Sequence, residues 1–107
     1  MITDAKCEES IHYLHDSDDE AAVAKTDVTK AEDEVKAIES AIFLRVEGSV
    51  EQRKALSRTD AETVKARNEY YSSLLKFERL YNKRKTAERI IELWRSINSN
   101  RRAGVQV

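Results

Sequence analysis

The sequence has 107 residues, of which 36% are charged, with no proline and only two glycines. A chain of this length forms one domain at most, and with so few prolines and glycines to break secondary structure, long helices are favoured over sheets. The single cysteine excludes an internal disulfide bond and is typical of a reducing compartment.

The apolar residues are too scattered for a membrane protein. No apolar run is longer than four residues, as at 41–44, whereas a helix needs about 20 to cross a bilayer. The first ten residues contain no basic stretch followed by an apolar one, so no secretory signal is expected. The sequence therefore predicts a soluble, cytoplasmic protein with no membrane partner.

The two ends of the chain carry opposite charge. Residues 1–40 contain twelve Asp and Glu against four Lys, a net charge of −8, and residues 41–107 contain eight acids against fifteen Lys and Arg, a net charge of +7. The total of −1 conceals this asymmetry. Such a dipolar chain indicates a charged partner for one half, or self-association between halves.

The acidic N-terminal segment, residues 1–17, predicts a short helix over residues 4–15. The run His15-Asp16-Ser17-Asp18-Asp19 is rich in residues that favour turns, so it is expected to break this helix. Ser17 is followed three residues later by Glu20, which is the pattern of a capping box. A second helix is therefore expected to begin at residue 18.

An acidic helix is predicted over residues 18–47, because its apolar residues are spaced alternately by four and three positions. This is the heptad spacing of a coiled-coil seam. The predicted seam residues are Ala24, Val28, Ala31, Val35, Ile38 and Ile42. Gly48 should end the helix, since glycine tolerates the left-handed backbone that commonly follows one.

A broken connection is predicted over residues 48–59. Ser49 and Gln52 form a second capping-box pattern, which indicates a short helix to about Leu56. Thr59 and Glu62 form a third, which marks the start of the last helix.

The last helix is predicted over residues 60–97 and is both basic and aromatic. Its seam again alternates by four and three, through Ala66, Tyr70, Ser73, Phe77, Leu80, Arg84, Ala87, Ile91 and Trp94. Arg84 stands within this seam, where an arginine needs a partner and can set the register of the helices. The polar residues 98–107 predict a mobile tail.

Together these elements predict an all-α fold, a single domain over residues 1–107 built as an antiparallel helical hairpin, or coiled coil, with a short N-terminal helix. Leu74, Leu75, Tyr81 and Ile90 lie off the seam and widen the apolar face of the last helix. Either the N-terminal segment or another subunit must cover them. We expect a homo-oligomer, because a hairpin this small buries little apolar area by itself.

The sequence offers little for catalysis. It has no glycine-rich phosphate loop, no nucleophile elbow and no paired-histidine helix motif, so a non-enzyme without cofactor is expected. Cys7, His12 and His15 are metal-ligand types in one segment, but no second ligand pair follows at a suitable spacing. A metal site is therefore not expected.

Basic residues gather between residues 76 and 85, which carry five positive charges and one negative charge. Cations at helical spacing can follow a phosphate backbone, and Tyr71, Tyr81 or Trp94 could stack on exposed bases. The alternative is that these cations pair with the acidic helix, within the hairpin or in a neighbouring subunit. The candidate nucleic-acid-binding residues are Lys76, Arg79, Lys83, Lys85, Arg89 and Arg95.

The segment Lys65-Ala66-Arg67-Asn68-Glu69-Tyr70-Tyr71-Ser72 resembles the Lys-Ala-Arg-x-x-Tyr-Tyr-Ser segment of the UvsY-type phage recombination mediators. That resemblance implies a small, charged, helical protein that oligomerises, binds single-stranded DNA and helps to load a recombinase. The expected function is accordingly a non-catalytic accessory protein that binds single-stranded nucleic acid. The alternative is a protein–protein interaction or assembly module, such as a phage structural or inhibitor protein, that uses its acidic helix and heptad seam.

Overall fold

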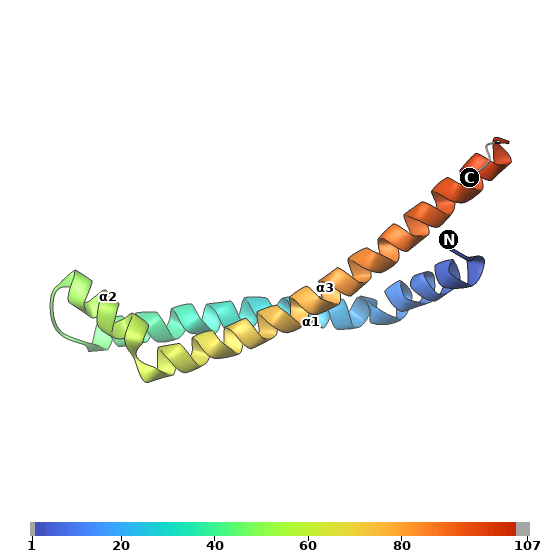
Figure 1. The fold of residues 1–107 in the computed structure, drawn as a ribbon. Helices are drawn as coiled ribbons and strands as arrows, with labels where there is room; N and C mark the ends of the chain where they lie inside the picture. Colours follow the sequence, from blue (N-terminus) through green and yellow to red (C-terminus); the bar gives the residue numbers. More distant parts are fainter. Residues whose placement is uncertain (1, 105–107) are drawn as a thin grey trace. The chain divides into compact units, whose positions relative to one another are not determined.

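A computed structural model describes residues 2–104, which form three helices and no strand. The helices are α1 (Asp4–Arg45), α2 (Val50–Thr59) and α3 (Ala61–Arg102), and α1 packs against α3 as a helical hairpin (Figure 1). The predicted all-α hairpin is confirmed.

Contacts between the helices divide the chain into two units. The terminal unit pairs the start of α1, up to Ala22, with α3 from Glu78 onward. The connection unit comprises Val23–Phe77 and contains α2. Each unit contains part of both long helices, so each is described by its own contacts.

The predicted break at residues 15–19 is wrong, because α1 continues through it without interruption. Ser17 is buried and caps nothing; its hydroxyl donates to the Tyr13 carbonyl oxygen at 2.6 Å. Position 17 belongs to the heptad seam, which extends to the N-terminus through Cys7, Ser10, Leu14, Ser17 and Ala21, all buried or half-buried. Packing on α3 therefore overrides the weak helix propensity of this run.

The two predicted seams are confirmed. Ala24 and Ile42 are buried in α1, and Ala66, Leu80 and Ala87 are buried in α3, while the intervening seam residues are half-buried. The contact surface is narrow and rich in small side chains. The α1–α3 pairing consequently depends on a few larger residues and on polar contacts across the seam.

The short helix α2 begins as predicted. The Ser49 hydroxyl accepts from the Gln52 N–H at 3.2 Å, and the Gln52 side-chain oxygen accepts from the Ser49 N–H at 3.0 Å. This reciprocal pair satisfies two backbone donors that the helix start would otherwise leave unpaired.

The start of α3 differs from the prediction. Thr59 does not cap it, because its hydroxyl donates to the Ala55 carbonyl oxygen at 2.8 Å, within α2. The carboxylate of Asp60 instead accepts from the Glu62 N–H at 2.9 Å. A cap at Asp60 places a negative charge at the positive end of the helix dipole.

The predicted tail is also partly wrong, since α3 continues to Arg102. Asn98 remains helical, and its side-chain amide donates to the Trp94 carbonyl oxygen at 2.9 Å. Residues 105–107 of the predicted tail lie outside the described residues.

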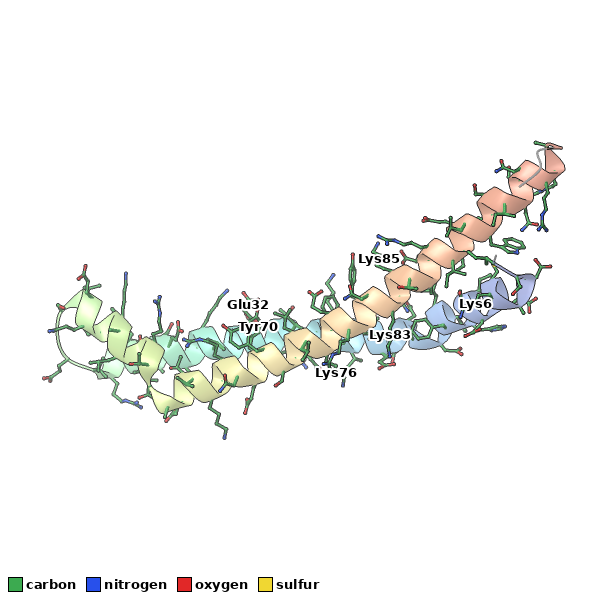
Figure 2. The ribbon with its side chains drawn as sticks, in the orientation of Figure 1. Lys6, Glu32, Tyr70, Lys76, Lys83 and Lys85 are labelled. Atoms are coloured by element: carbon green, nitrogen blue, oxygen red, sulfur yellow. The ribbon has the colours of Figure 1, made fainter. Side chains whose placement is uncertain are left out.

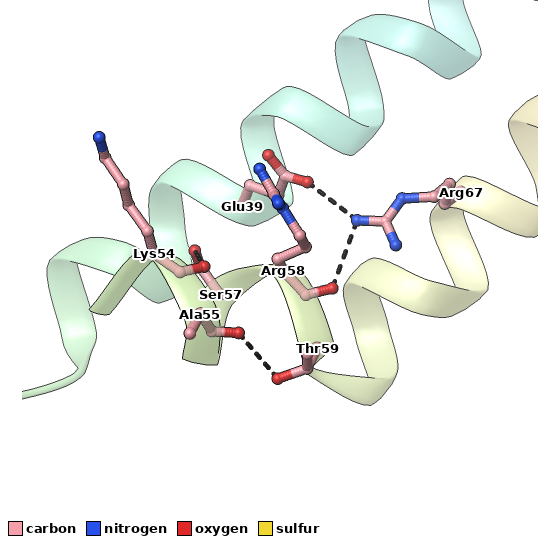
Figure 3. A network of polar contacts seen from close by, with 7 residues as sticks. All are labelled: Glu39, Lys54, Ala55, Ser57, Arg58, Thr59 and Arg67. Carbon is pink, nitrogen blue, oxygen red and sulfur yellow. Dashed lines mark hydrogen bonds and ion pairs between the residues drawn. The ribbon is translucent and has the colours of Figure 1, made fainter. Parts of the chain in front are cut away.

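Polar contacts join all three helices in the connection unit. Arg67 of α3 donates to the Glu39 carboxylate of α1 at 3.2 Å and to the Arg58 carbonyl oxygen of α2 at 3.3 Å (Figure 3). Arg53 donates twice to the Phe43 carbonyl oxygen, at 3.0 and 2.7 Å. These two arginines pair with carbonyl oxygens near the helix ends, which lack partners within a helix.

Gly48 is a sensitive position in the turn between α1 and α2. Its φ is +127°, and a Cβ built there would lie 2.8 Å from the Gln52 side-chain oxygen. We expect Gly48→Ala to lower the free energy of unfolding by about 1–2 kcal/mol, because it strains the backbone and disturbs the capping box. Urea denaturation measures this loss.

Gly104 provides the control for that substitution. It also has a positive φ, of +79°, but a Cβ there would meet nothing within 4 Å. Gly104→Ala should therefore cost less than Gly48→Ala. Equal losses in the two variants would contradict a role for the Gly48 turn in positioning α2.

Candidate nucleic-acid interface

Arg84 orients α3 in the terminal unit. Its guanidinium donates to the Leu14 carbonyl oxygen at 2.9 Å, to the Ser17 hydroxyl at 2.7 Å and to the Asp18 carboxylate at 3.2 Å. The sequence predicted that an arginine in the seam needs partners, and this prediction is confirmed. Because Arg84 and the seam face α1, the residues on the opposite side of α3 face outward.

Tyr81, beside the seam residue Leu80, and Lys85 and Arg89, farther round α3, are exposed and recur at intervals of four. With Asn82 and Thr86 they line a shallow depression of about 420 Å³ on the surface of α3. Arg95, exposed and two heptads after Tyr81, returns to the same side of the helix. Tyr81, Lys85, Arg89 and Arg95 are called the basic face below.

Lys85 is the most closely partnered cation of the basic face. Its ammonium donates to the Glu88 carboxylate at 3.4 Å and lies 5.5 Å from the centre of the Tyr81 ring. The hydrogen bond and charge of Glu88, followed by the charge of Tyr81, raise the pKa of Lys85 above its ordinary value. Lys85 is therefore positively charged at neutral pH.

The other predicted cations lie in different places. Lys83 lies on the side of α3 that faces the start of α1, whereas Lys85 projects from the other side (Figure 2). Lys83 lines a groove there with Lys6, Glu9 and Asp16. The structure thus separates Lys83 from the basic face, although both positions are exposed.

Arg79 and Lys76 are exposed as expected but do not line the depression beside Tyr81. Arg79 belongs to the terminal unit, and Lys76 belongs to the connection unit. Three of the candidate cations, Lys76, Arg79 and Lys83, are therefore divided between the two units.

The three aromatic candidates also differ in availability. Trp94 is half-buried, and its indole N–H donates to the Asp4 carboxylate at 2.8 Å, so it serves the α1–α3 contact. Tyr71 is exposed in the connection unit, with its ring 5.5 Å from that of Tyr70. Tyr81, 45% exposed, is the aromatic ring that lies beside the cations of the basic face.

Two polar residues of this surface, Asn82 and Thr86, were not predicted. They line the depression between the tyrosine and the cations, and Thr86 donates to the Asn82 carbonyl oxygen at 3.1 Å. The sequence could have identified them by their spacing of four residues, because Lys85 and Arg89 have the same spacing. Both side chains can exchange hydrogen bonds with a bound ligand.

The six predicted cations do not form the ion pairs between the helices of residues 2–104. The two pairs that join α1 to α3 use Arg67 with Glu39 and Arg84 with Asp18. Glu32, in the acidic helix, pairs instead with Lys36 of its own helix at 3.3 Å. Charge pairing inside the hairpin therefore does not account for the basic face.

No helix among the described residues has the length and apolar character needed to cross a membrane. Cys7 is buried in the seam, while His12 and His15 lie on the exposed side of α1. Within residues 2–104, no three His, Cys, Asp or Glu side chains come together as a group able to hold a metal ion. The chain matches no protein-family model, no curated protein and no solved structure.

Proposed function

We propose that this protein binds single-stranded nucleic acid through the basic face, as a non-catalytic accessory factor. The observation that carries the proposal is the grouping of Tyr81, Lys85 and Arg89 around one shallow depression on an exposed helix surface. Cations contact phosphates, and an adjacent aromatic ring can stack on a base. The bases of a single strand are open to such stacking.

The position of Tyr81 favours a single strand over a duplex. Tyr81 lies among cations on the surface of one helix, so a base can stack on its ring only after leaving its own stack, and the bases of a single strand are free to do this. Arg89 has no carboxylate of residues 2–104 within ion-pair distance, so binding a phosphate breaks no existing pair. The resemblance of residues 65–72 to the recombination mediators points to the same class of ligand and to a role beside a recombinase.

Replacing the three cations of the basic face tests this proposal. We expect Lys85→Gln/Arg89→Gln/Arg95→Gln to weaken the binding of a labelled single-stranded oligonucleotide similarly for every sequence. The dependence of log affinity on log salt should flatten by about 2 units, at roughly 0.7 for each phosphate that the variant no longer neutralises. Fluorescence polarisation at several salt concentrations measures both effects.

The matched control is Lys25→Gln/Lys30→Gln/Lys36→Gln, which changes the net charge equally at exposed positions of α1. It should leave the salt dependence nearly unchanged. A parent protein that binds no oligonucleotide at low salt would rule out the proposed function.

Tyr81→Leu tests stacking separately from charge. It should weaken binding by roughly 5- to 150-fold, the equivalent of about 1–3 kcal/mol for one stacked base, without changing the salt dependence. If the affinity is unchanged, phosphate contacts alone account for binding.

A second candidate function is favoured by the outer surface of α1. Glu8, Asp16 and Asp19 are exposed and lie on one side of this helix. A surface of this kind fits a basic protein partner, as an interaction or assembly module would. A protein that binds no oligonucleotide but retains a charge-dependent protein partner would have this function instead.

A further inference from the structure

The terminal unit carries opposite charges on its two helices. Residues 2–22 contain seven Asp and Glu and one Lys, and residues 78–104 contain eight Lys and Arg and three Glu. The formal charges are thus −6 and +5. Only one ion pair, Arg84 with Asp18, joins the two segments among the described residues. Most of these charged side chains therefore form no ion pair across the α1–α3 contact.

The two charged surfaces lie on exposed parts of different helices, and Asp16 of α1 also lines the groove that contains Lys83. Glu8, Asp16 and Asp19 are exposed and lie within about 80° of one another around α1, at 100° per residue. They are called the acidic face. None of the three forms an ion pair within residues 2–104. On α3, Arg89 and Arg95 of the basic face are likewise exposed and unpaired within the described part of the chain.

We infer that the acidic face of one copy of this chain docks on the basic face of a second copy. A second copy fits because every molecule carries both faces, and because the net charge of −1 brings no long-range repulsion between copies. In this contact, the carboxylates of one copy lie opposite the cations of the other copy. The occupant of the basic face, in the absence of nucleic acid, is therefore the protein itself.

Apolar side chains accompany both faces. Ile11, 49% exposed, lies in the acidic segment of α1, and Leu93, 54% exposed, lies between Arg89 and Arg95 on α3. Their burial adds a contribution to the contact that salt does not screen. Because the two faces differ, the contact is heterologous, and each copy retains one free face for the next copy.

Charge reversal on either face should abolish this contact. The acid-reversed variant is Glu8→Lys/Asp16→Lys/Asp19→Lys, and the base-reversed variant is Lys85→Glu/Arg89→Glu/Arg95→Glu. Light scattering should give a mass above the 12.3 kDa monomer for the parent protein at low salt. Each reversed variant alone should be monomeric, and an equal mixture of the two should recover the larger mass. Circular dichroism establishes that each variant remains helical.

A control separates docking from overall charge. Asp27→Lys/Asp33→Lys/Glu34→Lys makes the same change in net charge at exposed positions of α1 in the connection unit. This control should retain the larger mass of the parent. A monomeric parent at low salt, or a control that dissociates like the acid-reversed variant, would overturn the inference.

Docking also has a consequence for oligonucleotide binding, which rests on the proposed function. The neighbour's carboxylates occupy the cations that phosphates would contact, so self-docking and binding compete. The acid-reversed variant should therefore bind an oligonucleotide at least about threefold more tightly than the charge-matched control at low salt. Equal affinity of these two variants would refute the competition. If neither protein binds, the proposed function fails while the mass measurements still decide the docking.

Discussion

We expect Ile42→Ala to lower the free energy of unfolding by about 2–5 kcal/mol, the range measured for large-to-small changes at buried aliphatic sites. Ile42 is 2% exposed and is the largest fully buried apolar side chain of the described residues. Four of the other five predicted seam residues of α1 are alanine or valine, so few large side chains of this helix can fill the cavity that remains. Urea denaturation followed by circular dichroism measures the loss.

Leu44 supplies the matched control, two residues further along α1. It is 78% exposed, so Leu44→Ala removes a similar apolar group that contributes little to the core. Its effect should fall within about 0.5 kcal/mol of zero. Similar losses for the two variants would show that the end of α1 does not pack on α3 in the described register.

The spacing of apolar residues was sufficient to predict the hairpin. From Ala24 to Ile42 and from Ala66 to Trp94, alternation by four and three places one residue of each turn against the partner helix, and burial follows that pattern. Ser49 with Gln52 was equally predictable, because both partners of a capping box are local in sequence.

The N-terminal half of α1 was not predictable by the same criteria. Three of its five seam positions, Cys7, Ser10 and Ser17, are small or polar, so a search for apolar residues does not find the heptad there. Ser17 also resembles a helix cap from its local sequence. Its actual partner is Arg84, 67 residues away, and only the folded chain brings the two together. Tertiary contact here outweighs local preference.

The sequence predicted which cations belong to the candidate interface, but not which of them lie on the same side of α3. Helical spacing alone places Lys83 and Lys85 on the same basic helix without revealing which of them faces α1. Arg84 lies between them and contacts Leu14 and Ser17, and the folded chain places Lys83 toward the start of α1 and Lys85 on the other side (Figure 2). Lys83 then lines the groove beside Lys6, and Lys85 joins Tyr81 on the outer side.

We expect Arg84→Ala to lower the free energy of unfolding by about 2–3 kcal/mol, because the variant loses both the packing of the half-buried side chain and its charge-assisted hydrogen bonds. Arg84→Met retains the volume of the aliphatic stem and should cost less than Arg84→Ala. Urea denaturation of the two variants separates packing from hydrogen bonding.

A double-mutant cycle identifies which partner of Arg84 matters. Ser17 is buried beside the guanidinium, so Arg84→Ala and Ser17→Ala should couple by about 0.5–2 kcal/mol. Asp18 has a side chain that is 80% exposed, so its pairing with Arg84 is weakened by water and salt, and Asp18→Ala should be nearly additive with Arg84→Ala. A strong coupling to Asp18 with none to Ser17 would place the contribution of Arg84 at the surface rather than in the seam. The arginine would then not fix the register that turns the basic face outward.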